Sequence, residues 1–410
     1  MEKEFMDYIQ EQFIKILSLA IHGKKIDNTL VDEKMEWDKI FEEATAHNVR
    51  GLIYSALDKS IIDTIDKDLV DKFKKCTFVE GVYQVNHIKQ MGRIFNIFNR
   101  QNIEVIALKG LVVRRYYARP ELRTMCDGDI LVKKEDLLKV KKILEEFEYE
   151  DEGGEINHLT FKHKFYFSIE VHWSITNEEY FKGNKEFFDK VIWQNTQITN
   201  VGGSCVNELT LEFLIVYLCM HMATHCSYCG FGIRQITDLV LVIENEKDAI
   251  DWNITFELAR LCKLEKFMSI ILNVCEKLFN FKLPYDIKSL NKKEEKNIKI
   301  FMEEIFSNGV FGKRDRSKIL VKQINFKNKE NNESYIIKEI IFLIFPSRKK
   351  LTNKYNYAKK NFLLLPVAWI HHLISGIFNK DYEVKDKFKC AIYAMKIAKK
   401  KNKLINWLEL

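Results

Sequence analysis

The chain has 410 residues, of which 47% are apolar, and it carries a formal net charge of +7. A chain of this length and composition can bury a large core, and we expect two or three domains. The modest positive charge permits binding to phosphate groups but does not by itself indicate a nucleic-acid-binding protein. The sequence has no run of about 18 uncharged apolar residues, so we expect no membrane span.

The cysteines and the N-terminus bear on the cellular compartment. Nine cysteines occur without a repeated spacing, and we interpret them as reduced thiols rather than a disulfide framework. The first residues, MEKEFMDYIQ, mix both charges and lack the basic region followed by an apolar run that is typical of a signal peptide. We therefore predict a cytoplasmic location.

Residues 1–95 are predicted to form a helical region. The stretch 4–23 carries an apolar stripe at helical spacing and ends at Gly23, a residue that commonly stops helices. The segment 36–60 predicts a helical hairpin, and 67–101 predicts one long amphipathic helix.

The pattern then changes to short apolar runs. IEVIAL (103–108) predicts a buried strand, and a short helix follows at 111–118. RTMCDGDILV (123–132) predicts a second strand, and 133–150 an amphipathic helix that ends before a turn at 153–154.

The segment 158–175 alternates between apolar and polar residues, which predicts one half-exposed strand. Ile169 and Val171 lie on its apolar face. Glu170 and His172 lie on its polar face. Trp173, on the apolar side, is expected to belong to the core.

Helices are expected to return in a region at 201–345, with Asn207 as the N-cap of the first. Residues 285–335 are rich in lysine and asparagine and indicate a charged helix followed by an exposed loop. A C-terminal helical extension is expected at 346–410. The predicted fold class is thus α+β, with a small mixed sheet and flanking helices at 96–200 between helical regions.

Two aspartates stand just before the apolar end of the second strand. Residues two apart in a strand point to the same side, so Asp127 and Asp129 converge, and Glu170 joins them if the two strands are neighbours. Three carboxylates repel one another unless they are protonated or bind cations, and Mg²⁺ prefers such oxygen ligands. The alternative is a solvated turn, because Asp-Gly is a common turn dipeptide.

Lys109 and Gly110 favour the binding site over the turn. A glycine between a buried strand and a helix lets a backbone amide approach a phosphate, and the helix N-terminus adds partial positive charge. An expected anion site and an expected cation site are therefore separated by one short helix.

Three sequence blocks resemble a known family: ALKG (107–110), LRTMCDGDILV (122–132) and IEVHWSI (169–175). They are similar to the uncharacterised nucleotidyltransferase family within the DNA polymerase beta-like superfamily. The pattern of that family is a strand ending in Leu-Lys-Gly, an arginine before an Asp-x-Asp strand, and a later strand reading Glu-x-His-Trp. Gly128 departs from the apolar residue usual between the aspartates, and Leu111 from the serine of the wider superfamily.

The helical segments extend the resemblance over most of the chain, through AHNVRGLIYSAL, HMATH, IRQITDLVLVI and the C-terminal block 345–373. The resemblance implies a polymerase-beta-like core. It also implies metal-dependent transfer of a nucleoside monophosphate from a nucleoside triphosphate (NTP) to a hydroxyl-bearing acceptor, releasing pyrophosphate. The expected metal is Mg²⁺ or Mn²⁺. The acceptor is left open among a small molecule, tRNA and protein.

The resemblance also assigns roles to individual residues. The predicted catalytic residues and metal ligands are Asp127, Asp129 and Glu170, with Glu170 also helping to deprotonate the acceptor. Lys109 and Gly110 are expected to hold the triphosphate. Arg123 either neutralises phosphate charge or pairs with Asp127. His172 either orients Glu170, contacts the acceptor, or is structural.

Two other groups of residues are candidate sites. His221 and His225, followed by Cys226 and Cys229, have zinc-ligand residue types. The block is short and lacks a separated second pair, and the family carries histidines here without a zinc pattern, so we do not favour zinc. On the next predicted helix an arginine at 234 and an aspartate at 238 stand four apart; they either form an ion pair or face the nucleotide.

The lysine-rich segment 380–403 is interpreted as a solvated face, the alternative being a basic amphipathic helix that contacts RNA or a membrane surface. Two further functions stay open. One is a non-catalytic relative that binds a nucleotide or a partner, in a regulatory or antitoxin-like role. The other is an RNA-binding or RNA-modifying protein.

Overall fold

The N-terminal segments with apolar stripes fold as helices that pack their striped faces together. The computed structural model describes residues 6–154, 157–175, 183, 185–228, 230–280, 282, 292–310, 345–348, 351, 353–377 and 400–410. The N-terminal helices are α1 (Tyr8–Ile21), α2 (Trp37–Ala46), α3 (Arg50–Ala56), α4 (Lys59–Ile62) and α5 (Lys67–Arg100). The predicted hairpin and the predicted long helix are both present.

The remaining helices follow β1 in the chain; some pack against the sheet and the last ones form the C-terminal segments. They are α6 (Gly110–Val113), α7 (Leu137–Glu146), α8 (Lys185–Val191), α9 (Leu211–Tyr228), α10 (Ile233–Glu246), α11 (Trp252–Leu261), α12 (Glu265–Phe279), α13 (Lys292–Asn308), α16 (Asn356–Lys360) and α17 (Leu365–Ile377). Among the residues the structure describes, no helix combines the length and the apolar character that crossing a membrane requires.

In the part of the chain that the structure describes, seven strands form a mixed sheet in the order β3-β4-β5-β2-β1-β7-β6. The strands are β1 (Val105–Ala107), β2 (Asp127–Val132), β3 (Glu150–Gly154), β4 (His158–Lys162), β5 (Ser168–His172), β6 (Thr196–Val201) and β7 (Ser204–Leu209). β2 is parallel to β5 and antiparallel to β1, and β1 is parallel to β7. The predicted α+β class with a mixed sheet is therefore confirmed.

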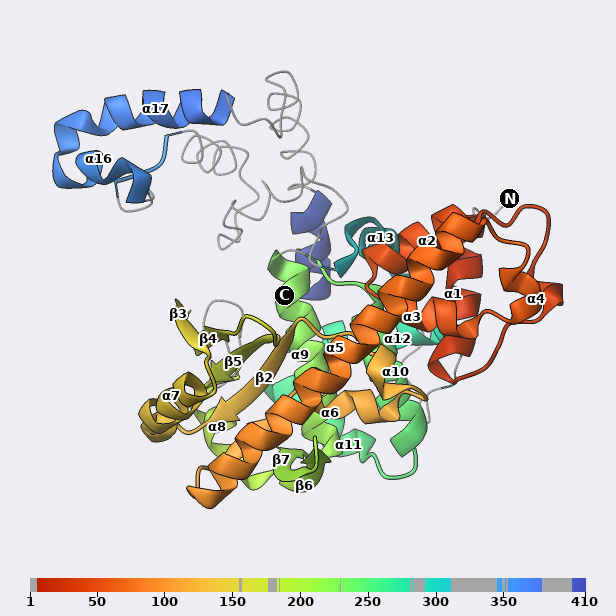
Figure 1. Ribbon diagram of the computed structural model, residues 1–410, viewed down its shortest axis with the longest axis horizontal. Helices are drawn as coiled ribbons and strands as arrows, with labels where there is room; N and C mark the ends of the chain where they lie inside the picture. The colour runs from red at the N-terminus through yellow and green to blue at the C-terminus, as the bar shows by residue number, and fades with distance from the viewer. Residues whose placement is uncertain are drawn as a thin grey trace.

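The long helix α5 runs diagonally across one face of the sheet, and α9 lies beyond the strands (Figure 1). Every residue of β1 is buried, as expected for a strand in the middle of the sheet. Its neighbour β2 is apolar and buried at Ile130–Val132 but begins with two aspartates. Among the described residues, one large buried cluster joins the N-terminal helices, the sheet and helices α9 to α13. The division into domains stays a prediction.

The predicted single strand at 158–175 is wrong. β4 and β5 are separate antiparallel strands, with His158 opposite His172. The backbone N–H groups of Phe165 and Tyr166 donate to His163 Nδ1 at 2.9 and 3.2 Å. This side-chain acceptor stabilises a turn that the alternating pattern hides.

Several predicted boundaries also differ. Asn207 is not a helix N-cap, because it lies inside β7 and pairs with Ile198 of β6; this hairpin was not predicted. The predicted turn at 153–154 is the end of β3, after an irregularity in the pairing with β4. The predicted helix 133–150 is the shorter α7, preceded by a 3-10 turn at Lys134–Asp136.

The C-terminal part is described only in segments. The predicted charged helix is present as α13, and residues 311–335 lie outside the described residues. Most of the lysine-rich segment, 380–399, also lies outside them, so its interpretation as a solvated face stays a prediction. α16 and α17 belong to a small apolar cluster distinct from the main core.

Candidate active site

The two aspartates of β2 point away from α5. A Cβ on Gly128 would lie 2.9 Å from Nε2 of His87, which belongs to α5. Since side chains alternate along a strand, Asp127 and Asp129 face the opposite side. There they line a cavity of about 130 Å³ together with residues of α9 and α10, among them His221 and Arg234.

Glu170 lies directly beside the aspartates. In the parallel pairing of β2 and β5, Asp129 is opposite Glu170 and Asp127 is opposite Ser168. Ligand atoms of Asp129, Glu170 and His172 all lie within 4.8 Å of one another. His172 Nε2 is 3.1 Å from Asp129 Oδ1 and 3.5 Å from Glu170 Oε2. The structure thus brings together the three carboxylates that the sequence places on separate strands, with His172 between two of them.

Lys109 supplies the positive charge nearest to these carboxylates. Its Nζ donates to Asp129 Oδ1 at 2.6 Å, and the side chains are 13% and 3% exposed. Its backbone has φ +47° and ψ −120°, a sparsely populated conformation that non-glycine residues keep only where the surroundings enforce it. The chain thereby turns sharply between β1 and α6. α6 has only four residues, so the lysine rather than a helix dipole provides the charge.

The two aspartates have different electrostatic environments. Burial opposes ionisation of Asp129, but the charge of Lys109 and the hydrogen bond from His172 hold its pKa well below the ordinary value. Burial and the nearby charge of Asp129 raise the pKa of Asp127 to about 6. The carboxylates therefore hold more negative charge than Lys109 compensates, and a divalent cation suits this oxygen-rich set. Among the described residues, Asp129, Glu170 and His172 have ligand atoms close enough together to hold one such ion, and Asp127 lines the same cavity.

Gly110 is needed for packing beside the cavity. A Cβ at this position would collide with Nη1 of Arg123 and Sδ of Met125. The missing side chain lets the Arg123 guanidinium pass over the start of α6, where both residues line the cavity.

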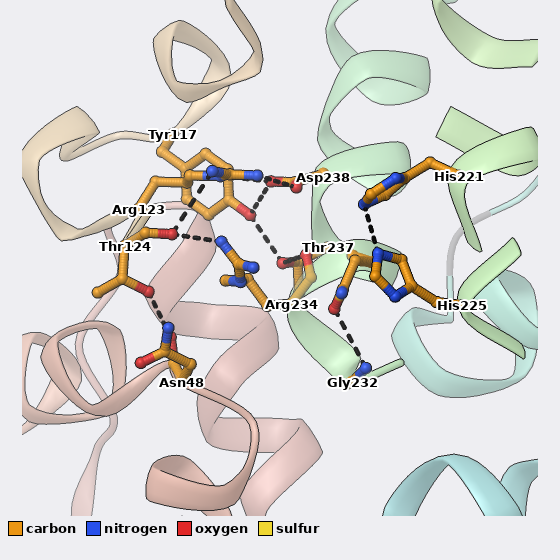
Figure 2. Close-up of polar contacts among 11 residues, drawn as sticks. Asn48, Tyr117, Arg123, Thr124, His221, His225, Gly232, Arg234, Thr237 and Asp238 are labelled. Atoms are coloured by element: carbon orange, nitrogen blue, oxygen red, sulfur yellow. Dashed lines mark hydrogen bonds and ion pairs between the residues drawn. The ribbon is translucent and has the colours of Figure 1, made fainter. Parts of the chain in front are cut away.

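Arg123 does not pair with Asp127, which corrects one of the two predicted roles. Its Nε donates to Asp238 Oδ1 at 3.0 Å, and its Nη2 donates to Asp238 Oδ2. Tyr117 donates its hydroxyl proton to the same carboxylate at 2.7 Å (Figure 2). Burial opposes the charge of Arg123, but Asp238 raises its pKa above the ordinary value. This fork-shaped pair joins the region after β1 to α10.

Arg234 is the second buried arginine at the cavity. Arg234 does not form the predicted ion pair with Asp238, because Asp238 pairs with Arg123 instead. Arg234 Nη1 instead donates to the carbonyl oxygen of Thr124 (Figure 2). Its Nε is buried and has no hydrogen-bond partner among the described residues. Burial and the nearby Arg123 lower its pKa, as expected for a cation that lacks an anion.

His221 and His225 form the α9 wall of the cavity. Their Nε2 atoms lie 3.0 Å apart (Figure 2). Burial lowers the pKa of His225 to about 4 and that of His221 well below its ordinary value. Both rings are therefore neutral at pH 7. Within the described part of the chain, the metal-type cluster consists of Asp129, Glu170 and His172 and does not include these rings; Cys229 lies outside that part.

Sequence reasoning missed the residue that explains Gly128. His87 is buried in α5, packs 5.0 Å from the Phe167 ring, and occupies the space a side chain at position 128 would take. Glycine thus allows α5 to approach β2 closely. The departure from the family pattern at position 128 was the available signal. Trp173, expected in the core, is half-buried.

One of the comparisons with known proteins identifies a family. A family model described as "Uncharacterised nucleotidyltransferase" matches residues 33–280. Among solved structures, the antibiotic-resistance factor ANT(2'')-Ia is 10% identical with a TM-score of 0.33, covering 47% of this chain and 98% of that one. An antigenic nucleotidyltransferase-like protein from Paracoccidioides brasiliensis is 14% identical with a TM-score of 0.29, covering 48% and 98%. No curated protein matches the chain.

Proposed function

The chain belongs to the uncharacterised nucleotidyltransferase family and is a nucleotidyltransferase enzyme; we propose that it moves a nucleoside monophosphate from an NTP to an acceptor hydroxyl, releasing pyrophosphate. The observation that carries this proposal is the register of β2 and β5, which sets Asp129 beside Glu170. That pairing puts three carboxylates at one wall of a cavity whose other walls carry Lys109 and Arg234. A nucleotide's phosphates and a divalent ion need these opposite charges close together.

Asp127, Asp129 and Glu170 would hold Mg²⁺ or Mn²⁺, with His172 orienting the Asp129 and Glu170 oxygens. When bound, such an ion neutralises phosphate charge and orients the attacking and leaving oxygens. Burial, and then the charge of Asp129, raise the pKa of Asp127, and a cation bound beside Asp127 would favour its ionised form.

Lys109, Gly110, Arg123 and Arg234 would bind the triphosphate. Arg234 is the strongest of these assignments, because the residue lines the cavity and its buried Nε lacks a partner among the described residues. Arg123 is held in place by Asp238 and adds positive charge at the same wall. The cavity is smaller than the roughly 300–1,000 Å³ of sites that enclose whole ligands. It therefore suits the phosphate end of the nucleotide.

Glu170 would also act as the base. The acceptor oxygen attacks the α-phosphorus in line, its proton passes to the Glu170 carboxylate, and the bond to the pyrophosphate oxygen breaks. His172, 3.5 Å from Glu170, would fix the orientation of that carboxylate. Burial opposes protonation of His172, but its hydrogen bonds to Asp129 and Glu170 raise its pKa. Catalysis would come mainly from positioning and charge neutralisation.

The test is transfer of label from each α-labelled NTP in the presence of a cell extract, followed by mass identification of the labelled product. The variant carrying both Asp127→Ala and Asp129→Ala should lose transfer completely. Glu208→Gln is the matched control, because Glu208 is a buried, ion-paired carboxylate of the same sheet. Circular dichroism checks that each variant is folded.

Transfer that survives in the folded double variant would refute the metal-site assignment. Titration of Mg²⁺ and each NTP into the wild-type protein by calorimetry adds an independent readout. Binding without transfer in any extract would instead favour the non-catalytic, nucleotide-binding alternative.

A further inference from the structure

The C-terminal helix α17 exposes an apolar stripe. Leu363, in the turn before the helix, is followed by Val367, Ile370 and Ile374, which share one face at helical spacing. Leu363 is 68% exposed and Ile370 is 58% exposed. An exposed row of large aliphatic side chains of this kind marks an interaction surface.

The opposite face of α17 is packed and keeps the stripe facing outward. Ala368 is fully buried in a small cluster with Tyr355. Trp369 donates its Nε1 proton to the carbonyl oxygen of Pro346 at 2.9 Å, and its ring lies 5.4 Å from that of Phe345. These contacts with nearby segments of the chain set the orientation of α17, and the stripe residues take no part in them.

The charge of this end of the chain favours one kind of partner for the stripe. Residues 346–410 contain fifteen lysines and arginines but only four acidic residues, a net charge of +11, whereas residues 1–345 carry −4. Basic residues flanking an apolar helix face are typical of segments that lie on anionic lipid surfaces.

We infer that α17 binds the surface of an anionic membrane, with Leu363, Val367, Ile370 and Ile374 entering the lipid interface. RNA would be attracted by the charge but offers no reason for an exposed aliphatic row. A second copy placed on the stripe would bring two strongly positive segments together, at an electrostatic cost. An anionic bilayer satisfies both the apolar stripe and the charge. This surface role is additional to the proposed transfer reaction.

Flotation of the full chain with lipid vesicles tests this inference. The chain should bind vesicles of equal parts phosphatidylcholine and phosphatidylglycerol, should bind phosphatidylcholine vesicles far more weakly, and should be released as salt rises. Ile370→Glu should weaken binding by about tenfold or more, because a large aliphatic contact is lost. Leu138→Glu is the matched control, since Leu138 is 76% exposed on α7 and the charge change is the same. Ile370→Ser against Leu138→Ser separates the apolar contact from the added charge.

The inference is overturned if the wild-type chain fails to bind the anionic vesicles, or if both glutamate variants bind them equally well. It is also overturned if light scattering shows a dimer that Ile370→Glu dissociates while vesicle binding is unchanged. RNA binding that displaces no vesicles and is insensitive to Ile370→Glu would show that the basic charge acts separately from the stripe, which also refutes the inference. None of these readouts depends on nucleotide transfer, so this inference and the proposed function can fail independently.

Discussion

Lys109 and Asp129 form a buried ion pair at the centre of the site, and a double-mutant cycle on this pair separates folding from catalysis. The cycle consists of Lys109→Met, Asp129→Asn and the double variant. Each single change leaves one charge buried without its partner, whereas the double change replaces the pair with two neutral side chains of similar size. The two single variants should therefore be much less stable than the double variant.

The size of the effect follows from the geometry. At the observed 2.6 Å separation, Coulomb's law with an effective dielectric constant of about 20 gives roughly 6 kcal/mol of attraction, much of which offsets desolvation. Removing one partner of a buried pair costs about 3–5 kcal/mol. Glu170 and Asp127 remain near Lys109, so we expect about 3 kcal/mol for Asp129→Asn. The double variant should recover most of this loss.

The assay is urea unfolding followed by circular dichroism, with label transfer measured on the same preparations. The cycle should give a coupling energy of about 2 kcal/mol or more between the two sites. Both variants that carry Asp129→Asn should lack transfer, including the stable double variant. Additive stability effects would refute the ion pair as the group that neutralises Asp129. A double variant that transfers label would refute Asp129 as an essential ligand.

Three further predictions follow from contacts elsewhere. Arg234→Gln should raise KM for the NTP about tenfold or more, because a buried charge-assisted contact to phosphate is lost, with Arg234→Lys less affected; an unchanged KM in steady-state kinetics would contradict the phosphate role. Gly128→Ala should lower the free energy of unfolding by about 1–3 kcal/mol through overpacking against His87, and adding His87→Ala should restore much of this loss. An unchanged free energy of unfolding for Gly128→Ala, measured with urea, would contradict the prediction. The hydrogen bond to Glu244 raises the pKa of His22, so the bridge stabilises the fold below the unfolded pKa of about 6.5 and is lost as pH rises through the higher folded value. The free energy of unfolding of the wild type should therefore exceed that of His22→Gln by up to about 1 kcal/mol at low pH. This difference should fall to near zero as pH rises, and a difference that grows with pH would contradict the prediction.

Local sequence patterns determined much of this protein. The helical spacing of apolar residues predicts α5 to within a residue of its observed ends, because a helical face repeats over many turns. The period of two in a strand makes Asp127 and Asp129 face the same way, whatever lies next to them. The Lys109-Gly110 pair indicated the break between β1 and α6, because the two residues are consecutive in the chain and their pattern is local.

Tertiary structure alone decided the neighbours. That β2 lies beside β5, and that Asp129 is level with Glu170, depends on the order and register of strands about forty residues apart, which no local period specifies. The partner of Arg123 is Asp238 of α10, which lies 115 residues further along the chain. The pair forms because a buried guanidinium pairs with the carboxylate that packing brings to it. His87 behind Gly128 was equally hidden, since only the docking of α5 on the sheet brings that ring against the strand.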